Sequence, residues 1–229
     1  MIGDALAQLH DSLVVSVQAY PGEPMRDPLV MASVAEACVQ GGAVGIRAQG
    51  LDDLREIRMR VPVPLIGLRK VGTDGVFITP TLEDAVACAD AGSDIVAIDG
   101  TRRRRPDGRT LAETVAEFRL ARPDVLLMAD CGSLDDALAA EQAGVDCVGT
   151  TLAGYTGERA RTSGPDFDLL DEFVSRIALP VIAEGRFHSP ADARAGLRAG
   201  AHAVVVGTAI THPTTITGWF AAAMHETDA

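Results

Sequence analysis

Four glycines recur along the chain in the same local setting, and their spacing is the feature that most restricts the fold. Gly42, Gly92, Gly144 and Gly200 each follow a helix-like stretch and precede, within a few residues, a short apolar run. They lie 50, 52 and 56 residues apart, too long for one βα unit of about 30 residues but suitable for two. Each glycine is expected to mark a helix C-terminus before an even-numbered strand.

Eight short apolar runs fit this spacing. They are continuous rather than alternating, as is typical of parallel strands that are covered on both faces. We expect strands at 13–17, 44–47, 64–68, 94–98, 125–129, 146–149, 180–183 and 203–207. Eight units in 229 residues have about 29 residues each, close to the usual size of a (β/α)8 barrel. The sequence therefore predicts an α/β protein in which residues 1–229 form a single (β/α)8 TIM-barrel domain.

Helix-start signals support the same arrangement. The segments 81–84 (TLED) and 133–136 (SLDD) have the capping-box pattern, and Ser189 is followed by a proline at the expected first helical position. A short amphipathic helix at the N-terminus is predicted from four apolar residues at helical spacing, Ile2, Leu6, Leu9 and Leu13. The alternative is an open, doubly wound sheet, which is disfavoured because no G-x-G-x-x-G phrase follows the first strand.

Charge and cysteine content narrow the functional classes. The formal net charge is −12, and Lys and Arg are concentrated only in the run Arg102–Arg105, so a nucleic-acid partner is not expected. A local positive pocket could still bind a small anion. The four cysteines form no C-x-x-C pair, and neither a signal peptide nor a long apolar span is seen. These features favour a cytoplasmic protein with reduced thiols and no membrane partner.

Polar residues close nearly every expected strand. In a barrel of this kind reactive groups gather at the C-terminal rim, where charges must be paired or directed at a ligand. The strand-end residues are Gln18, Arg47, Lys70, Asp99, Asp130, Thr150, Glu184 and the pair Gly207-Thr208. Alternation along the third strand puts Ile66, Leu68 and Lys70 on one face and Arg69 on the other, and we expect Lys70 to point inward. Burial and a nearby Arg47 would lower the pKa of Lys70, as a proton-abstracting base requires; an ion pair with a rim carboxylate is the alternative.

The last two strands end in glycine-bearing phrases, at 182–186 and 204–211. Gly185 and Gly207 would let backbone N–H groups approach an anion, and a short helix after the eighth strand would direct its positive end toward it. The two phrases therefore predict a phosphate site on this part of the rim.

The histidines and cysteines indicate neither a metal site nor a nucleophilic cysteine. No paired histidine spacing or H-E-x-x-H motif occurs, so no metal is expected. His188 and His212 fall in rim loops and could touch a substrate, whereas His202 begins a strand at the opposite end and is expected to be structural. Cys131 has no adjacent histidine base, which disfavours a nucleophilic role.

Two long polar loops, at 100–109 and 153–164, are candidates for mobile lids. The first contains the Arg102–Arg105 run, which we expect to be a solvated loop face that could steer a phosphorylated ligand inward.

Taken in order, the strand-end phrases resemble one known family. They are VSVQA (15–19), GIRA (45–48), FITPT (77–81), MAD (128–130), VGTTLAGYT (148–156), IAEGR (182–186) and VVVGTAIT (204–211). Any one phrase has low specificity, but the complete ordered series, from about residue 14 to residue 220, resembles the N-acylglucosamine-6-phosphate 2-epimerases. The resemblance implies a cofactor-independent isomerase that interconverts N-acetylmannosamine 6-phosphate and N-acetylglucosamine 6-phosphate in bacterial sialic-acid breakdown.

The resemblance also implies roles for individual residues. Lys70 and Glu184 match the family's catalytic lysine and glutamate, and Gln18, Arg47 and Asp130 match its substrate contacts. We expect further substrate contacts at Thr150, Tyr155, Gly185, Arg186, Gly207, Thr208 and His212. Our hypothesis is that Lys70 moves the proton at C2, with Glu184 on the opposing side, while Arg47 and Gln18 hold the oxygen that gains charge.

The chain departs from the family pattern at three places. His212-Pro213 stands where the family usually has an arginine before the proline, which implies a weaker and pH-dependent phosphate contact. The segment 71–74 reads VGTD rather than a basic and aromatic sequence. Cys131-Gly132 replaces a more usual apolar residue and serine.

Two other functions stay open at this point. One is a different phosphate-binding barrel, either a metal-using pentose-phosphate epimerase or a synthase acting on a sugar phosphate. The other is a non-catalytic sensor of sugar phosphates.

An apolar stripe at helical spacing lies near the C-terminus, formed by Ile216, Trp219, Phe220 and Met224. It would either pack on the core or meet a partner chain. Core packing is the commoner explanation, although the resembled family often forms dimers.

Overall fold

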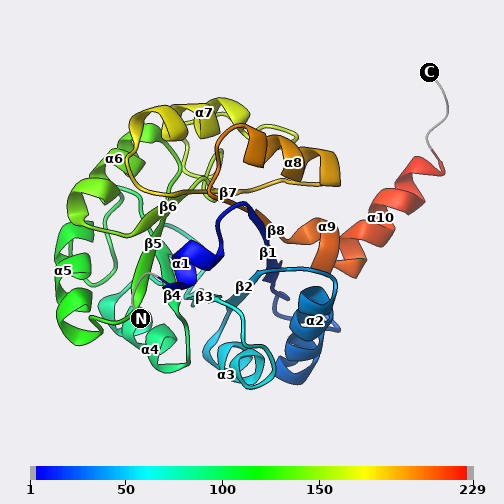
Figure 1. Ribbon diagram of the computed structural model, residues 1–229, viewed down its shortest axis with the longest axis horizontal. Helices are drawn as coiled ribbons and strands as arrows, with labels where there is room; N and C mark the ends of the chain where they lie inside the picture. The colour runs from blue at the N-terminus through cyan, green and yellow to red at the C-terminus, as the bar shows by residue number, and fades with distance from the viewer. Residues whose placement is uncertain (1–3, 226–229) are drawn as a thin grey trace.

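The eight strands close into a parallel barrel (Figure 1). The computed structural model describes residues 4–225. Each strand pairs in parallel with the next, and β8 returns to pair with β1. The strands are β1 (Ser12–Val17), β2 (Gly45–Gln49), β3 (Leu65–Leu68), β4 (Ile95–Asp99), β5 (Leu126–Asp130), β6 (Cys147–Gly149), β7 (Val181–Glu184) and β8 (Ala203–Val206). Every expected strand overlaps an observed one, so the predicted (β/α)8 barrel is confirmed.

Helices alternate with the strands and surround the barrel (Figure 1). Those between consecutive strands are α2 (Pro28–Gln40), α3 (Leu51–Arg60), α4 (Leu82–Asp90), α5 (Leu111–Ala121), α6 (Leu134–Ala143), α7 (Phe167–Arg176) and α8 (Pro190–Arg198). The helix α1 (Asp4–Gln8) precedes β1, and α9 (Thr208–Thr211) and α10 (Pro213–Ala223) follow β8. Between residues 4 and 225 no helix has the length and apolar character needed to cross a membrane.

The predicted helix starts are confirmed. Thr81, Ser133 and Ser189 are N-caps whose hydroxyls accept a hydrogen bond from the third helical N–H. Of these three, only Ser189 has the reciprocal bond of a full capping box. At the other two, one carboxylate oxygen of Asp84 or Asp136 binds an arginine. The second oxygen accepts from the Thr81 hydroxyl in Asp84 and from the Gly132 N–H in Asp136.

The four spaced glycines end helices as expected. Gly42, Gly92, Gly144 and Gly200 all have positive φ angles, between 89° and 104°, a region that residues with a Cβ rarely adopt. Gly67 on β3 is required for a different reason. A Cβ there would lie 1.9 Å from Ser93 Oγ, so α4 and its C-terminal turn approach β3 closely only because no side chain intervenes.

Helix α1 lies over the centre of the barrel (Figure 1). Leu9, just after it, is fully buried in the interior cluster, with Leu6 packed against the same cluster. The predicted N-terminal helix is therefore present, but it is shorter than its apolar pattern indicated. It ends at Gln8, Leu13 belongs to β1, and Ile2 lies outside the described residues. The reason is that Leu13 joins the β1–β8 ladder, opposite Val204, rather than continuing a helical face.

Helix α10 projects from the barrel (Figure 1), and none of its residues is buried. Phe220 is 70% exposed, and Trp219 is 39% exposed. Met224, at the C-cap, is 82% exposed. The expectation that this stripe packs on the core is therefore wrong. The barrel interior and the helical ring are already filled by other side chains, which leaves the stripe facing outward.

Candidate active site

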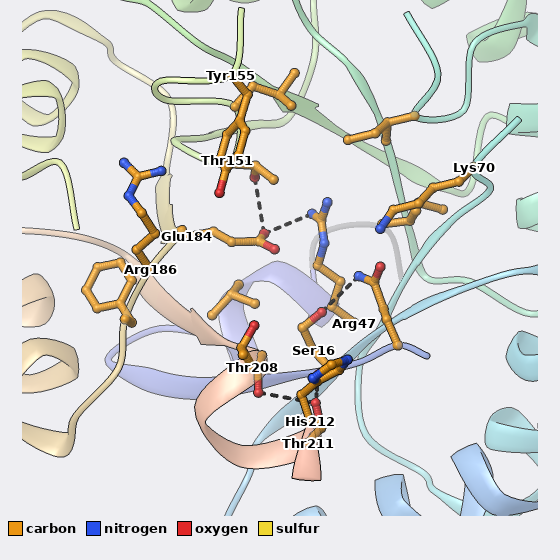
Figure 2. A pocket seen from close by; sticks show the side chains of 18 of the residues that line it. Ser16, Arg47, Lys70, Thr151, Tyr155, Glu184, Arg186, Thr208, Thr211 and His212 are labelled. Atoms are coloured by element: carbon orange, nitrogen blue, oxygen red, sulfur yellow. Dashed lines mark hydrogen bonds and ion pairs between the residues drawn. The ribbon is translucent and has the colours of Figure 1, made fainter. Parts of the chain in front are cut away.

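A cavity of about 380 Å³ lies at the carboxyl ends of the strands (Figure 2). Ten of the twelve sequence-predicted site residues line it: Gln18, Arg47, Lys70, Tyr155, Glu184, Gly185, Arg186, Gly207, Thr208 and His212. The other two, Asp130 and Thr150, are not among its lining residues. Both are buried and contact Arg47 and Glu184 instead.

The floor of the cavity is a buried ion pair. Arg47 is 1% exposed and forms a bidentate pair with fully buried Asp130, at 3.1 Å from Nη1 to Oδ1 and 2.6 Å from Nη2 to Oδ2. Arg47 Nη1 also lies 3.2 Å from Glu184 Oε2. Burial by itself lowers the pKa of Arg47, but the two carboxylates more than compensate and hold it above its ordinary value. Asp130 therefore acts by fixing the guanidinium, because losing either partner would strand a buried charge.

The third strand places Lys70 as the alternation predicted. Ile66 and Leu68 are fully buried in the barrel interior, and Lys70 continues that face into the cavity. Arg69 turns to the other side, where its Nη1 lies 2.9 Å from Asp84 Oδ1. In the part of the chain that the structure describes, Lys70 has no ion-pair partner, so the expected alternative of a paired lysine finds no support.

Burial lowers the pKa of Lys70, and the positive charge of Arg47 lowers it further. The Lys70 ammonium lies 5.0 Å from the ring centroid of Tyr20, a cation–π distance. Figure 2 shows Lys70 and Glu184 pointing toward one another from opposite sides of the cavity, with the Arg47 guanidinium between them. A base with a lowered pKa and a carboxyl group thus face the same space.

Two consecutive threonines hold Glu184 at the end of β7. The Thr150 hydroxyl accepts from the Glu184 N–H at 3.0 Å and donates to the Glu184 carbonyl at 2.8 Å. The Thr151 hydroxyl lies 3.1 Å from Glu184 Oε2. Burial raises the pKa of Glu184 to about 7, with Asp130 adding to the increase and Arg47 opposing it. A carboxyl with this pKa exists in both protonation states near neutral pH, as acid–base catalysis requires.

Backbone geometry opens the rim at β7 and β8. Gly185 and Arg186 have φ angles of 113° and 59°, both in the left-handed region, so the chain turns sharply after Glu184. The helix α9 begins at Thr208, directly after Gly207. Both glycines and Thr208 line the cavity, so the segments from which an anion site was predicted border the same space.

The Arg186 side chain is held by the loop at 153–164. Its guanidinium donates to the carbonyls of Ala153 and Gly164, each at 2.9 Å, and to Thr162 Oγ1 at 2.8 Å. It also lies over the Tyr155 ring, 5.5 Å from the centroid. Arg186 therefore joins both ends of this loop while its backbone borders the cavity.

His212 is similarly occupied by protein partners. Its Nε2 lies 2.6 Å from Glu23 Oε1, and its Nδ1 lies 2.6 Å from Thr215 Oγ1. The other Glu23 oxygen accepts from the Tyr20 N–H at 2.7 Å. The His212–Glu23 pair thus fastens the loop after β1 to the start of α10, and it places the Tyr20 ring edge-on to His212 at 5.9 Å.

The cavity also contains residues that the sequence reasoning missed. Ser16 and Tyr20 line it together with Gln18, and the spacing of two residues from Gln18 in both directions is the signal that could have found them. Thr151 rather than Thr150 faces the cavity. The short β6 ends at Gly149, and the turn that follows breaks the alternation from which its position could have been inferred.

The arginine run is only in part the solvated face that we expected: Arg102 and Arg104 are exposed, but Arg103 is half-buried and Arg105 is buried. Arg105 is 2% exposed and donates to the Asp99 and Pro80 carbonyls. The Asp99 carboxylate, fully buried, accepts from Arg103 Nη2 at 2.7 Å. Arg102 pairs with Glu158 at 2.9 Å, which joins the two long loops. The sequence suggested solvation because like charges repel, whereas the fold supplies an acceptor for each of these three side chains.

Cys131 and His202, which the sequence analysis did not expect to be reactive, have structural surroundings. Cys131 is fully buried, and burial raises the pKa of its thiol well above the ordinary value, which makes it a poor nucleophile. His202 Nε2 donates to the Leu6 carbonyl at 2.8 Å, at the α1 end of the barrel. Within residues 4–225 no three His, Cys, Asp or Glu side chains are grouped so that they could hold a metal ion.

Comparison with known proteins places this geometry in a family. The family described as "Putative N-acetylmannosamine-6-phosphate epimerase" matches residues 31–226. Two relatives bear the name "Putative N-acetylmannosamine-6-phosphate 2-epimerase". The one from Cutibacterium acnes is 56% identical over 94% of this chain and 94% of its own length. The one from Corynebacterium glutamicum is 49% identical over 96% of this chain and 95% of its own length. The solved structure of the Clostridium perfringens N-acetylmannosamine-6-phosphate 2-epimerase superimposes with a TM-score of 0.91 at 37% identity, covering 95% of each chain.

A thiamine phosphate pyrophosphorylase from Pyrococcus furiosus, at 20% identity and a TM-score of 0.60, covers 89% of this chain and 87% of its own and shares the fold alone. The ordered strand-end phrases, the inward lysine and glutamate and the relatives along nearly the whole chain agree with one another. This chain belongs to the N-acetylmannosamine-6-phosphate epimerase family.

Proposed function

We propose that this protein interconverts N-acetylmannosamine 6-phosphate and N-acetylglucosamine 6-phosphate, as an isomerase of amino-sugar and sialic-acid catabolism that needs no cofactor. The observation that carries the proposal is the placement of Lys70 and Glu184 on opposite sides of one cavity. Burial shifts both pKa values toward neutrality, downward for the lysine and upward for the glutamate. Relatives with this name, related along nearly their whole lengths, support the choice of substrate.

The chemistry follows from the position of C2 beside an aldehyde in the open-chain sugar. Removal of the C2 proton leaves an enolate, which becomes accessible when its oxygen is stabilised by fixed positive groups. Lys70 takes the proton from one face, and Glu184 supplies a proton to the other, directly or through a substrate hydroxyl. Inversion at C2 requires a proton lost from one face and returned to the other, and the proposal is supported by Lys70 and Glu184 pointing into the cavity from opposite sides.

Arg47 and Gln18 are the residues that we assign to the oxygen that gains charge. Two carboxylates hold the Arg47 guanidinium in place. It therefore does not have to reorganise during the reaction. The Gln18 Nε2 donates one hydrogen to Ser16 Oγ at 2.9 Å, and its second N–H is the donor that we assign to the charged oxygen. The buried Gln18 Oε1 has no partner in the described residues. A substrate hydroxyl at this position would satisfy it.

The phosphate group is assigned to the rim at β7 and β8, where Gly185, Arg186, Gly207 and Thr208 supply backbone N–H groups and a hydroxyl. His212 contributes to this wall through a ring already bound to Glu23. Because a phosphate is held here mainly by backbone donors, the site depends on the local turn geometry more than on a free cationic side chain.

The test is proton NMR of N-acetylmannosamine 6-phosphate incubated with the protein in heavy water. We expect N-acetylglucosamine 6-phosphate to form with deuterium at C2. Lys70→Ala should lower the rate by at least about 10²-fold, the usual contribution of a general acid/base. Arg69→Ala is the matched control, since its side chain points away from the cavity. Near-normal turnover by Lys70→Ala, or a product without deuterium at C2, would refute the assignment.

We further propose that the protein is a cytoplasmic homodimer that binds no nucleic acid and no membrane. The support for dimerisation is the exposed apolar surface of α10, in which Phe220 is 70% exposed, because monomers rarely leave large apolar side chains clustered in solvent. Sedimentation of the wild-type chain and of Phe220→Asp tests it. A wild-type mass of one chain would overturn the dimer. The four cysteines are unpaired thiols, in keeping with a reducing compartment.

A further inference from the structure

The hydroxyl of Thr151 lies between two acidic side chains, those of Asp130 and Glu184, and Figure 2 shows its contact with Glu184. Its Oγ1 is 2.7 Å from Asp130 Oδ1 and 3.1 Å from Glu184 Oε2. A threonine hydroxyl has a single hydrogen to donate. It can therefore serve only one of the two carboxyl groups at a time, and the shorter contact is with Asp130.

The two oxygens of the Glu184 carboxyl have different surroundings. Oε2 makes both protein contacts, with Thr151 at 3.1 Å and with Arg47 Nη1 at 3.2 Å. Across residues 4–225 Oε1 has no hydrogen-bond partner. The side chain keeps 13% of its surface exposed and lines the cavity. Oε1 is thus the oxygen available to a substrate, and Oε2 is the oxygen that the protein controls.

Three charged groups and one hydroxyl surround Glu184, and they come from four strands or the loops that follow them. Arg47 extends from β2, Lys70 follows β3, Asp130 ends β5, and Thr151 follows β6. On its other side, β8 places Val205 beside Glu184 in the ladder. Among residues 4–225, Arg47 is the one cation in bonding distance of both carboxylates, and Asp130 already binds both of its terminal nitrogens. The Glu184 carboxylate is therefore the less well neutralised of the two.

We propose that Thr151 is a positioning residue for the acid–base chemistry of Glu184, its hydroxyl hydrogen turning between Asp130 and Glu184 as the Glu184 carboxyl loses and gains a proton. When Glu184 is ionised, the hydroxyl donates to Oε2. When Oε1 has received a proton from the cavity, Oε2 becomes a weaker, uncharged acceptor and the hydroxyl hydrogen turns to Asp130. Asp130 keeps its two bonds from Arg47 in both states, so no buried carboxylate is left without a donor.

This proposal deepens the proposed function, on which its catalytic consequence rests, but its physical content can be tested without substrate. Because the hydroxyl donates to the ionised form of Glu184, its removal destabilises that form. The Thr151→Val protein keeps the shape of the side chain and lacks the donor. Removing the hydroxyl also costs the protonated form a bond to Asp130, but that carboxylate keeps its two bonds from Arg47, so the loss at Glu184 is the larger of the two. We therefore expect the titration midpoint of Glu184 to rise by the difference, which is less than the roughly one pH unit of a whole hydrogen bond to a charged group.

Thr151→Ser restores the donor and should return the midpoint to the wild-type value. Thr114→Val is the matched control: Thr114 is fully buried in α5 and its hydroxyl donates to the Thr110 carbonyl, so it loses a buried hydroxyl of the same kind far from Glu184. The midpoint of Glu184 should not change in the control. Thr151→Ala replaces the valine variant if the latter does not fold.

The measurement is the ¹³C chemical shift of glutamate carboxyl groups against pH in protein labelled at that carbon, with the Glu184 signal identified as the one absent from Glu184→Gln. A rise in Thr151→Val that Thr151→Ser reverses supports the proposal. An unchanged or lowered midpoint in Thr151→Val overturns it, as does an equal rise in Thr114→Val. The low-pH limb of the rate of deuterium entry at C2 should move by the same amount. If no deuterium enters in the wild-type protein but the carboxyl midpoint still moves, the proposed function fails and the role of Thr151 stands.

Discussion

Replacing Glu184 with glutamine should change how the stability of this protein depends on pH. Glu184 has a pKa of about 7 in the folded protein against an ordinary value of 4.5. Below pH 4.5 the carboxyl is protonated in both the folded and the unfolded states. Between about pH 4.5 and 7 the unfolded chain releases this proton while the folded chain keeps it, so the free energy of unfolding falls as the pH rises. Above pH 7 both states are ionised and the loss is complete.

The difference of about 2.5 pH units corresponds to about 3 kcal/mol, since each unit is worth about 1.4 kcal/mol. This is a large part of a typical unfolding free energy of about 5–15 kcal/mol. Glutamine has the shape of the protonated glutamate but cannot ionise. Glu184→Gln should therefore be more stable than the wild-type protein at pH 8, by up to about 3 kcal/mol, and nearly equal to it at pH 4.5.

Urea unfolding at several pH values between 4.5 and 8, at one protein concentration, measures this difference. Other groups with shifted pKa values contribute to both proteins; burial raises the pKa of Asp53, for example. They cancel in the comparison, so the difference between the two proteins isolates Glu184. Parallel curves over this range would refute the reasoning, because they would mean that Glu184 ionises equally easily in the folded and the unfolded states.

Three further outcomes follow from particular contacts. Glu23→Gln removes the charge that holds His212. Steady-state kinetics should show a KM for the phosphorylated sugar that is about tenfold higher, an effect equal to the loss of roughly one charge-assisted hydrogen bond, and a smaller change in kcat. Gly67→Ala, whose Cβ would lie 1.9 Å from Ser93 Oγ, should cost about 1–3 kcal/mol of unfolding free energy, and adding Ser93→Ala should recover part of it in urea titrations. Asp99→Ala leaves Arg103 and the buried N–H and hydroxyl of Thr101 without their acceptor. It should cost about 1–3 kcal/mol of unfolding free energy and speed proteolysis within 100–109; unchanged cleavage there would count against it.

The sequence predicted the barrel because its signals are local and repeated. Each glycine that ends a helix at positive φ and each serine or threonine N-cap acts within a few residues of itself. Their spacing sets the number of βα units. Continuous apolar strands require cover on both faces, and a closed barrel surrounded by helices provides it. Alternation along β3 was sufficient to assign Lys70 to the interior side.

Side chains that interact across the barrel were less predictable. Arg186 was expected at the substrate, but its guanidinium binds the loop at 153–164. The run ending at Arg105 was expected in solvent, but the buried end of β4 accepts its hydrogen bonds. The acceptors of Arg186 lie 22 and 33 residues away along the chain, whereas Arg103 and Arg105 reach Asp99 only 4 and 6 residues back. In neither case does residue type alone reveal which acceptor a long arginine side chain will reach.

The amino-acid order by itself determined the number and sequence of elements, the rim at which the chemistry gathers, and the family. The tertiary structure alone decided the protonation of that rim. Arg47, Asp130, Thr151 and Glu184 come from β2, β5, the turn after β6 and β7, and only closure of the barrel brings them within 3.2 Å of one another in a chain of contacts. Electrostatic energies depend on distance and burial, and neither of these can be read from positions along a chain.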